Sequence, residues 1–252
     1  MLEKHVRKNW AAGIKGVFFD LYGTLLVFEN FDKANLEWEN TFYKLTGKKH
    51  HLEFYHCQRL CRDILELTHE KDSSLGLTTY ETKIKKGLEN FNINLPLDEL
   101  KYVASATVSS WQKEIQLADD AVNVIKKLKQ NKVTGLITNF DHTPHVYKVL
   151  EETGLKELFD FVIVSDDAGI EKPSPEIFKM ALEKSNLNSD EVVYIGDNLK
   201  DDICGAVSAG IKPIFISRDI KSHYNHVENQ DELFPKGLLR ISSLSDLTRI
   251  FE

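Results

Sequence analysis

The sequence predicts an α/β fold: a doubly wound parallel-sheet core with an inserted α-helical domain. Short runs of β-branched and aromatic residues alternate with helical segments after residue 133, and this alternation is typical of a parallel sheet with helices on both faces. The stretch 28–117 carries only helical periodicity. The chain has 252 residues, which is enough for a core domain with a smaller insert.

The predicted strands are short apolar runs that each end in a polar residue. In chain order they are Lys15–Asp20, Val133–Asn139, Phe161–Ser165, Val192–Asp197 and Pro213–Ser217. Runs of this length that are apolar throughout suit strands that are buried on both faces. Helices are expected between the later strands, where each segment is long enough for a right-handed crossover: Asp141–Glu152, Pro175–Ser185 and Leu199–Ala209.

Hydrophobic residues of the insert recur at every third or fourth position, which predicts four amphipathic helices. The first stripe is Phe31, Ala34, Trp38, Phe42 and Leu45, and the second is Phe54, Cys57, Cys61 and Leu65. The third is Tyr80, Ile84, Leu88 and Phe91, and the fourth is Leu100, Val103, Thr107, Trp111 and Ile115. We interpret these side chains as the core of a helical bundle. The predicted domains are therefore a core of residues 1–27 and 118–252 and a helical domain of residues 28–117.

The composition indicates a cytoplasmic protein with a small-molecule substrate. Lys and Arg number 32 against 39 Asp and Glu, a formal net charge of -7, which argues against nucleic acid as a partner. No apolar run approaches the ~18 residues of a membrane span, and the first residues contain no apolar segment of a secretory signal. Three cysteines do not make a disulfide framework; Cys57 and Cys61 are expected to be buried rather than to bind metal. We expect a monomer or homodimer.

Candidate site residues stand where the predicted strands end, because ligands bind outside the carboxyl ends of parallel strands. Asp20 ends the first strand and is followed by Gly23 and Thr24. A tight turn there can place backbone N–H groups and a hydroxyl beside the carboxylate, which can then act as a nucleophile. Thr138 and Asn139 end the next core strand and can hold the oxygens of a phosphoryl group.

Two further segments carry charge at predicted strand ends. Lys172 stands just before Pro173 and can neutralise charge between a nucleophilic carboxylate and a phosphate. Asp197, Asp201 and Asp202 put three carboxylates within six residues. They repel one another unless a cation lies among them, and Mg²⁺ is the natural counterion for such oxygen ligands. The alternative is an acidic helix N-terminus, which the helix dipole favours.

In order and spacing, these segments resemble the four motifs of the haloacid dehalogenase-like (HAD) hydrolases: DLYGTLL, LITN, EKPSPEIF and GDNLKDDICGA. The resemblance covers the chain from Lys15 to Ser217. It implies a Rossmann-like core, a small helical cap domain inserted after the first motif, and closure of that cap over the site to select the substrate.

The resemblance also implies a role for each matching residue. Asp20 would be the nucleophile and a Mg²⁺ ligand, with further ligands from the backbone carbonyl of Tyr22 and from Asp197. The remaining acidic ligand fits Asp202 best, with Asp201 as the alternative. The residues expected to bind or stabilise the phosphoryl group are Thr24, Thr138, Asn139 and Lys172.

One position departs from the pattern of the family's phosphatases, which carry a second Asp two residues after the nucleophile as general acid. Tyr22 stands there, as in the family's 2-haloacid dehalogenases, and a phenol with a pKa near ~10 is a poor substitute. The dehalogenases, however, use no metal and lack the Gly196–Asp197 pair, and they bind halide through a cap Arg that no motif identifies here.

We therefore predict a Mg²⁺-dependent hydrolase of this family, a phosphatase that acts on a small phosphorylated metabolite through an aspartyl-phosphate on Asp20. The alternatives are a metal-independent 2-haloacid dehalogenase and a catalytically weak phosphate-binding or regulatory protein of the same fold. A missing general acid is tolerable where the leaving group is already good; it otherwise costs the enzyme a factor of ~10²–10⁴ in rate.

Overall fold

The computed structural model describes residues 10–67, 70–218 and 237–251, and the chain divides into two compact units. Unit 1 comprises Met1–Val27, Leu117–Asn139 and Val149–Glu252; unit 2 comprises Phe28–Gln116 and Phe140–Lys148. The segment Phe140–Lys148 therefore packs with the helical unit, although the predicted boundaries assign it to the core. Its neighbours on both sides along the chain belong to unit 1.

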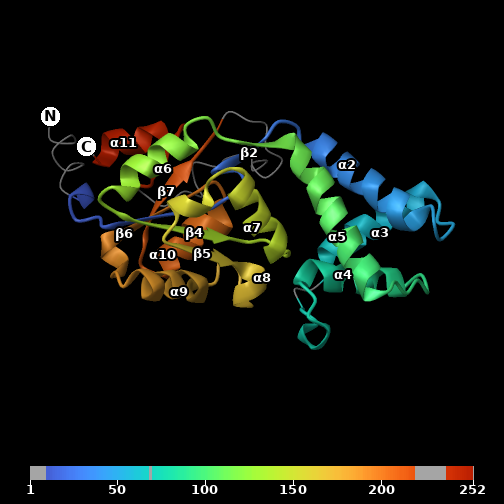
Figure 1. Cartoon of the computed structure of the whole chain (residues 1–252). Coiled ribbons are helices and arrows are strands. Elements are labelled where there is room, and N and C mark those ends of the chain that lie inside the picture. Colours follow the sequence, from blue (N-terminus) through green and yellow to red (C-terminus); the bar gives the residue numbers. More distant parts are fainter. Residues whose placement is uncertain (1–9, 68–69, 219–236, 252) are drawn as a thin grey trace. The chain divides into compact units, whose positions relative to one another are not determined.

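Unit 1 contains a parallel sheet of six strands in the order β5-β4-β1-β6-β7-β8 (Figure 1). The strands are β1 (Gly16–Phe19), β4 (Val133–Thr138), β5 (Phe161–Val164), β6 (Val192–Gly196), β7 (Lys212–Ile216) and β8 (Leu239–Ile241). The predicted α/β class is confirmed. Four of the five predicted runs contain a whole strand, and the fifth overlaps β7, which begins one residue before it. The sequence analysis missed β8, which is only three residues long.

Helices cover both faces of this sheet. Figure 1 shows α6 (Ala121–Lys129) and α11 (Ser245–Phe251) on one side and α9 (Pro175–Ser185) and α10 (Gly205–Ser208) on the other. Two more helices follow β4 and β5, namely α7 (Thr143–Glu152) and α8 (Ser165–Ala168). Residues on the α9 side pack into one hydrophobic cluster that includes Phe18, Phe178 and Tyr194.

The predicted helix Leu199–Ala209 is not regular. Leu199–Cys204 is a π-helical segment that continues into the short helix α10. The carbonyl of Asn198 accepts hydrogen bonds from the backbone N–H groups of both Asp202 and Ile203, at 3.0 and 3.2 Å. Sharing one acceptor between neighbouring donors widens this turn, which a sequence pattern of helical period does not reveal.

Unit 2 is built from α2 (Phe31–Phe42), α3 (Phe54–Glu66), α4 (Thr79–Glu89) and α5 (Leu97–Trp111), with a π-helical segment over Tyr43–Gly47 after α2. Residues from all four helices form its core, as predicted: the buried set includes Trp38, Phe42, Cys57, Leu60, Cys61, Ile64, Ile84, Leu88, Val103 and Val108. Cys57 and Cys61 are buried free thiols.

Two side chains of the predicted stripes lie elsewhere. Leu65 is 61% exposed, and Ile64 takes the buried position instead. Ile115 is not helical, because α5 ends at Trp111 and Ile115 begins strand β3 (Ile115–Leu117). Strand β3 pairs with β2 (Leu26–Phe28) in a two-stranded sheet. The chain passes from unit 1 to unit 2 within β2 and returns within β3.

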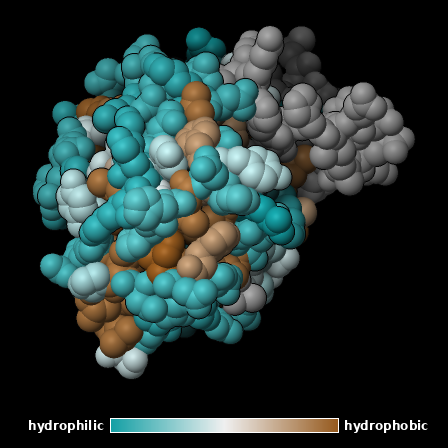
Figure 2. Space-filling view, turned by 90° about the vertical axis from the view of Figure 1, so that its right-hand side faces the viewer, coloured by the Kyte–Doolittle hydropathy of each residue, from teal (hydrophilic) through white to brown (hydrophobic). Residues whose placement is uncertain are grey.

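The visible surface is mainly polar. The face drawn in Figure 2 is largely hydrophilic, and hydrophobic residues appear on it in small groups. Six of the seven large hydrophobic side chains that the described residues expose belong to unit 2 and are spread over several elements. Within the described ranges, every helix is too short or too polar to cross a membrane.

Candidate active site

The predicted site residues of unit 1 follow neighbouring strands at one edge of the sheet. Strand β1 lies between β4 and β6, and Phe19 is in register with Leu136 and Ile195. Asp20 extends this register, because its backbone N–H donates to the carbonyl of Ile195 at 2.9 Å. The parallel ladder thus brings the residues after β1, β4 and β6 to the same edge.

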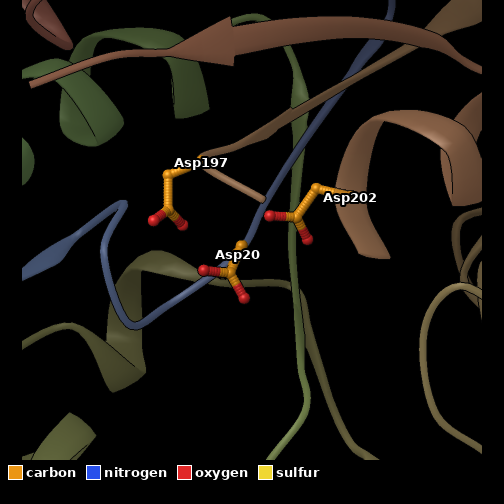
Figure 3. A group of neighbouring side chains, drawn as sticks. All are labelled: Asp20, Asp197 and Asp202. Atoms are coloured by element: carbon orange, nitrogen blue, oxygen red, sulfur yellow. The ribbon is translucent and has the colours of Figure 1, made fainter. Parts of the chain in front are cut away.

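Three carboxylates converge at this edge. Asp20, Asp197 and Asp202 each offer an oxygen, and these oxygens all lie within 4.8 Å of one another; Figure 3 shows the three side chains as neighbours. Asp20 and Asp202 are buried, and Asp197 is half-buried. Asp201 is not a member of any such group among the described residues, so the structure groups Asp202 with the other two.

Lys172 joins two of these carboxylates. Its Nζ donates to Asp20 Oδ1 at 2.6 Å and to Asp202 Oδ1 at 2.7 Å. The third hydrogen bond is to the hydroxyl of Tyr194, at 3.0 Å, so the three donors of the buried ammonium all have partners.

Tyr194 is a site residue that the sequence analysis missed. Its hydroxyl contacts Lys172 Nζ, Asp202 Oδ1 at 3.2 Å and the carbonyl of Ile137 at 3.0 Å. A signal for it existed: the phenol stands in the middle of a fully buried strand, where its hydroxyl needs a polar partner. The strand pattern alone does not identify which partner that is.

Asn139 and Thr138 play different parts in the structure. The side chain of Asn139 exchanges two hydrogen bonds with the backbone of Lys172, from Nδ2 to the carbonyl at 2.9 Å and from the N–H to Oδ1 at 2.8 Å. Its amide therefore positions Lys172. Thr138 is buried, and no hydrogen bond joins its hydroxyl to another of the described side chains or backbone groups, so this hydroxyl can serve a ligand.

The turn after Asp20 needs glycine at position 23. Gly23 has a φ of +89°, and a Cβ there would stand 2.1 Å from Asp197 Oδ2. Thr24 donates from its hydroxyl to Asp197 Oδ1 at 3.3 Å, and its carbonyl accepts from Arg218 at 3.0 Å. Thr24 thus contacts a carboxylate of the site in this structure. Tyr22 lies in the same turn, where it forms an isolated bridge with Leu26.

Burial and mutual repulsion shift the ionisation of the site. Burial raises the pKa of Asp20 to about 6; the Lys172 ammonium opposes this rise and the Asp202 carboxylate adds to it. Burial and the two neighbouring carboxylates raise the pKa of Asp197 well above its usual range. Burial lowers the pKa of Lys172, but Asp20 and Asp202 outweigh it and leave the pKa raised. Burial raises the pKa of Tyr22, which makes its phenol a weaker acid.

The cluster of Asp20, Asp197, Asp202 and Lys172 is suited to bind a hard divalent cation. Three carboxylates and one ammonium leave a formal charge of two negative units on a cluster that is largely removed from water. Such an excess is costly unless a cation offsets it. All the offered ligand atoms are carboxylate oxygens, which Mg²⁺ prefers over nitrogen or sulfur.

The chain is similar to known hydrolases over most of its length. Pyrimidine 5'-nucleotidase YjjG of Escherichia coli (strain K12) is 25% identical over 93% of this chain and 96% of its own. (S)-2-haloacid dehalogenase 4A of Burkholderia cepacia is 24% identical over 81% of this chain and 84% of its own. In fold, the chain resembles a HAD phosphatase from Thermococcus onnurineus, with a TM-score of 0.64 at 23% identity over 94% of this chain and 97% of that one.

The match to a family model agrees with the fold, with the clustered site residues and with the similar proteins. A model of the haloacid dehalogenase-like hydrolases matches residues 14–210, a range that begins before β1 and ends after α10. It includes every residue of the cluster at the sheet edge and the whole helical insertion. The chain therefore belongs to the haloacid dehalogenase-like hydrolases.

Proposed function

We propose that this protein is a Mg²⁺-dependent phosphatase that acts on a small phosphorylated metabolite. The observation that carries the proposal is the convergence of the Asp20, Asp197 and Asp202 carboxylates, with the Lys172 ammonium paired to two of them. Grouping two buried carboxylates with a half-buried one is costly unless a cation offsets their charge. A relative over 93% of the chain is named a nucleotidase, which agrees with a phosphate ester as substrate.

Asp20 is the proposed nucleophile. One of its carboxylate oxygens attacks phosphorus, the bond from phosphorus to the ester oxygen breaks, and the ester oxygen leaves with the electron pair and takes a proton from water. The product on the protein is an aspartyl-phosphate. Attack of water on its phosphorus then releases inorganic phosphate and restores the Asp20 carboxylate.

The surrounding residues hold the reacting groups. Lys172, fixed by Tyr194 and by the amide of Asn139, keeps Asp20 in place and offsets negative charge. The Thr138 hydroxyl and the backbone N–H of Asn139 donate to the phosphoryl oxygens, together with groups of the Thr24 turn. These contacts position the phosphorus opposite the Asp20 carboxylate.

Asp20, Asp197 and the backbone carbonyl of Tyr22 would hold Mg²⁺. Both oxygens of Asp202 already accept hydrogen bonds, from Lys172 and from the Asn198 N–H at 2.9 Å, so we assign Asp202 to the site through its charge and through Lys172. When bound, Mg²⁺ draws charge from the phosphoryl oxygens and makes the phosphorus easier to attack.

Tyr22 sets a limit on the leaving group. Its phenol is half-buried beside Asp20, and the direction of its pKa shift is upward. It therefore gives little help in protonating an alkoxide. We expect fast turnover of esters with good leaving groups and slow turnover of simple alkyl phosphates. We also propose that unit 2 is the cap that selects among such substrates.

Hydrolysis of p-nitrophenyl phosphate tests this function, because its phenolate leaves without much protonation. We expect turnover with Mg²⁺, none with EDTA, and a loss of at least about 10³-fold in kcat for Asp20→Asn. Asp190→Asn, an exposed acidic residue, is the control and should match the wild type.

Two results would count against the phosphatase. Metal-independent release of halide from a 2-haloacid, abolished by Asp20→Asn, would establish the dehalogenase alternative. Binding of phosphate without turnover of any activated ester would establish a regulatory or binding protein of this fold.

A further inference from the structure

Arg218 lies beyond residues 14–210, which the family model matches, yet its side chain contacts the turn that follows Asp20. It stands shortly after β7, the strand that pairs with β6. The guanidinium Nη2 donates to the carbonyl of Thr24 at 3.0 Å. Only 17% of the Arg218 side chain is exposed, so the contact is largely removed from water. Both residues belong to unit 1.

The carbonyl of Thr24 needs a donor. Thr24 is fully buried, and a buried carbonyl that loses its hydrogen bond destabilises the conformation in which it is buried. The next carbonyl along the turn, that of Leu25, accepts from the backbone N–H of Ala118 at 2.9 Å. The Thr24 carbonyl accepts from a side chain instead. Arg218 therefore helps to fix the conformation of this turn.

Thr24 connects Arg218 to the clustered carboxylates. Its hydroxyl donates to Asp197 Oδ1 at 3.3 Å, while its carbonyl accepts from Arg218. A carboxylate has two oxygens, so Asp197 can accept from Thr24 through one and bind a cation through the other. Hydrogen bonds of this kind orient the ligands of a metal. The orientation of Asp197 thus depends on where the turn holds the Thr24 hydroxyl.

Asp120 keeps the guanidinium in place. Asp120 Oδ1 lies 3.8 Å from Arg218 Nη2, and its Oδ2 accepts from the backbone N–H and the hydroxyl of Ser245, at 2.9 and 3.1 Å. Asp120 directly precedes α6 and Ser245 begins α11, two helices on the same side of the sheet (Figure 1). Burial lowers the pKa of Arg218, and the carboxylates of Asp120 and Asp197 oppose this change.

We propose that Arg218 is a positioning residue of the metal site: it fixes the turn that carries Thr24, and the Thr24 hydroxyl in turn holds Asp197 in the orientation that binds Mg²⁺. This inference rests on the proposed Mg²⁺-dependent function and adds to it a residue that none of the four motifs contains.

The position of Arg218 and its charge predict opposite effects on Mg²⁺ binding. A guanidinium that acted only by its positive charge would repel the cation, so its removal would make the three carboxylates bind Mg²⁺ more tightly. A guanidinium that holds the turn keeps Asp197 in place, so its removal weakens Mg²⁺ binding. The direction of the change in affinity therefore separates the two roles.

Thermal unfolding across a Mg²⁺ titration, without substrate, measures this affinity. In Arg218→Met, the Kd for Mg²⁺ should rise at least about 10-fold, and the Mg²⁺ concentration that gives half-maximal turnover of p-nitrophenyl phosphate should rise in parallel. Arg218→Lys should stay within about threefold of the wild type, because the contacts with Thr24 and Asp120 both use Nη2 and an ammonium can supply one charged donor.

Arg249→Met is the control for the loss of a positive charge from unit 1. The Arg249 side chain is 83% exposed, and it pairs with Asp246 on α11 at 3.2 Å. The Kd of this variant for Mg²⁺ should equal that of the wild type.

Thr24→Val tests the route from Arg218 to Asp197. The change keeps the branched shape of the side chain and the carbonyl that Arg218 contacts, but it removes the hydroxyl. Its Kd for Mg²⁺ should also rise at least about 10-fold. Adding Arg218→Met to Thr24→Val should then change the Kd by less than about twofold, because both substitutions break the same connection.

An unchanged or lower Kd in Arg218→Met, or losses that multiply in the double variant, would overturn the inference, while Mg²⁺ binding by the wild type upheld the proposed function. If Arg218→Met does not fold, Asp120→Asn replaces it: its Kd should rise, and an unchanged Kd would overturn the inference equally. Absence of any Mg²⁺ response in the wild type would instead overturn the proposed metal-dependent function, and this inference with it.

Discussion

Replacing Asp197 by Asn should act in opposite directions on the metal-free and the Mg²⁺-bound protein. The change keeps the shape of the side chain and its acceptor for the Thr24 hydroxyl, but removes one of the three clustered negative charges. In EDTA this relieves repulsion from Asp20 and Asp202, so the variant should be more stable than the wild type. With Mg²⁺ it removes a proposed ligand, so the stabilising effect of the metal should shrink.

The geometry sets the size of both effects. Two unit charges 4.8 Å apart interact with about 3.5 kcal/mol at an effective dielectric constant of about 20. Asp197 is half-buried, so solvent screens part of this repulsion. We therefore expect a gain of about 1–2 kcal/mol in EDTA, which raises the Tm by several degrees. The same charge lost from the metal site should weaken Mg²⁺ binding by about 100-fold or more.

Thermal unfolding in EDTA and across a Mg²⁺ titration measures both quantities, since a ligand that binds only the folded state raises the Tm. Asp201→Asn is the matched control. It removes an equal charge only four positions further along the chain, but the Asp201 side chain is not part of the cluster. This variant should keep the wild-type response to Mg²⁺. A lower Tm of Asp197→Asn in EDTA, or a Mg²⁺ response equal to that of the wild type, would refute the reasoning.

Two further variants test the turn at the site and a buried histidine. Gly23→Ala should destabilise the protein by more than Gly154→Ala does, and it should abolish the Mg²⁺ shift of the Tm. Both positions have positive φ, but only a Cβ at position 23 would clash with Asp197. An equal loss of stability in the two variants would contradict this. Burial is the main cause that lowers the pKa of His145 from 6.5 to about 3, so the unfolded chain binds the extra proton and stability falls as the pH drops below about 6.5. Urea unfolding should show a loss of about 2 kcal/mol from this group at pH 5, which His145→Gln abolishes; an identical pH dependence in the variant would rule the histidine out.

Much of the fold could be predicted from local patterns. Runs that are apolar throughout predicted five strands of the parallel sheet, and helical periodicity predicted the bundle of the insertion. Polar residues at the ends of these runs predicted the site, because parallel strands bring their carboxyl ends to one edge. This reasoning named Asp20, Thr138 and Asp197 from their positions along the chain, and the structure brings the segments that carry them together.

Local patterns failed where a position depends on a distant neighbour. Leu65 fits the stripe of α3 as well as Ile64 does, but packing against the other helices buries Ile64 and leaves Leu65 exposed. Strands β2 and β8 are each three residues long and exist because partners elsewhere in the chain pair with them. Such short strands carry too few residues for a period to be recognised.

The sequence by itself determined the class of fold, the edge of the sheet where the chemistry lies, and the residue types present there. Only the tertiary structure decided how they are used. Lys172 donates to Asp20, which lies 152 positions earlier in the chain. The side chain of Asn139 forms hydrogen bonds with the Lys172 backbone, and the Tyr194 hydroxyl is the third partner of the Lys172 ammonium. The physical reason is that hydrophobic period is a property of neighbouring residues, whereas the partner of a buried polar group is set by which distant segments the sheet and helices bring within hydrogen-bonding distance.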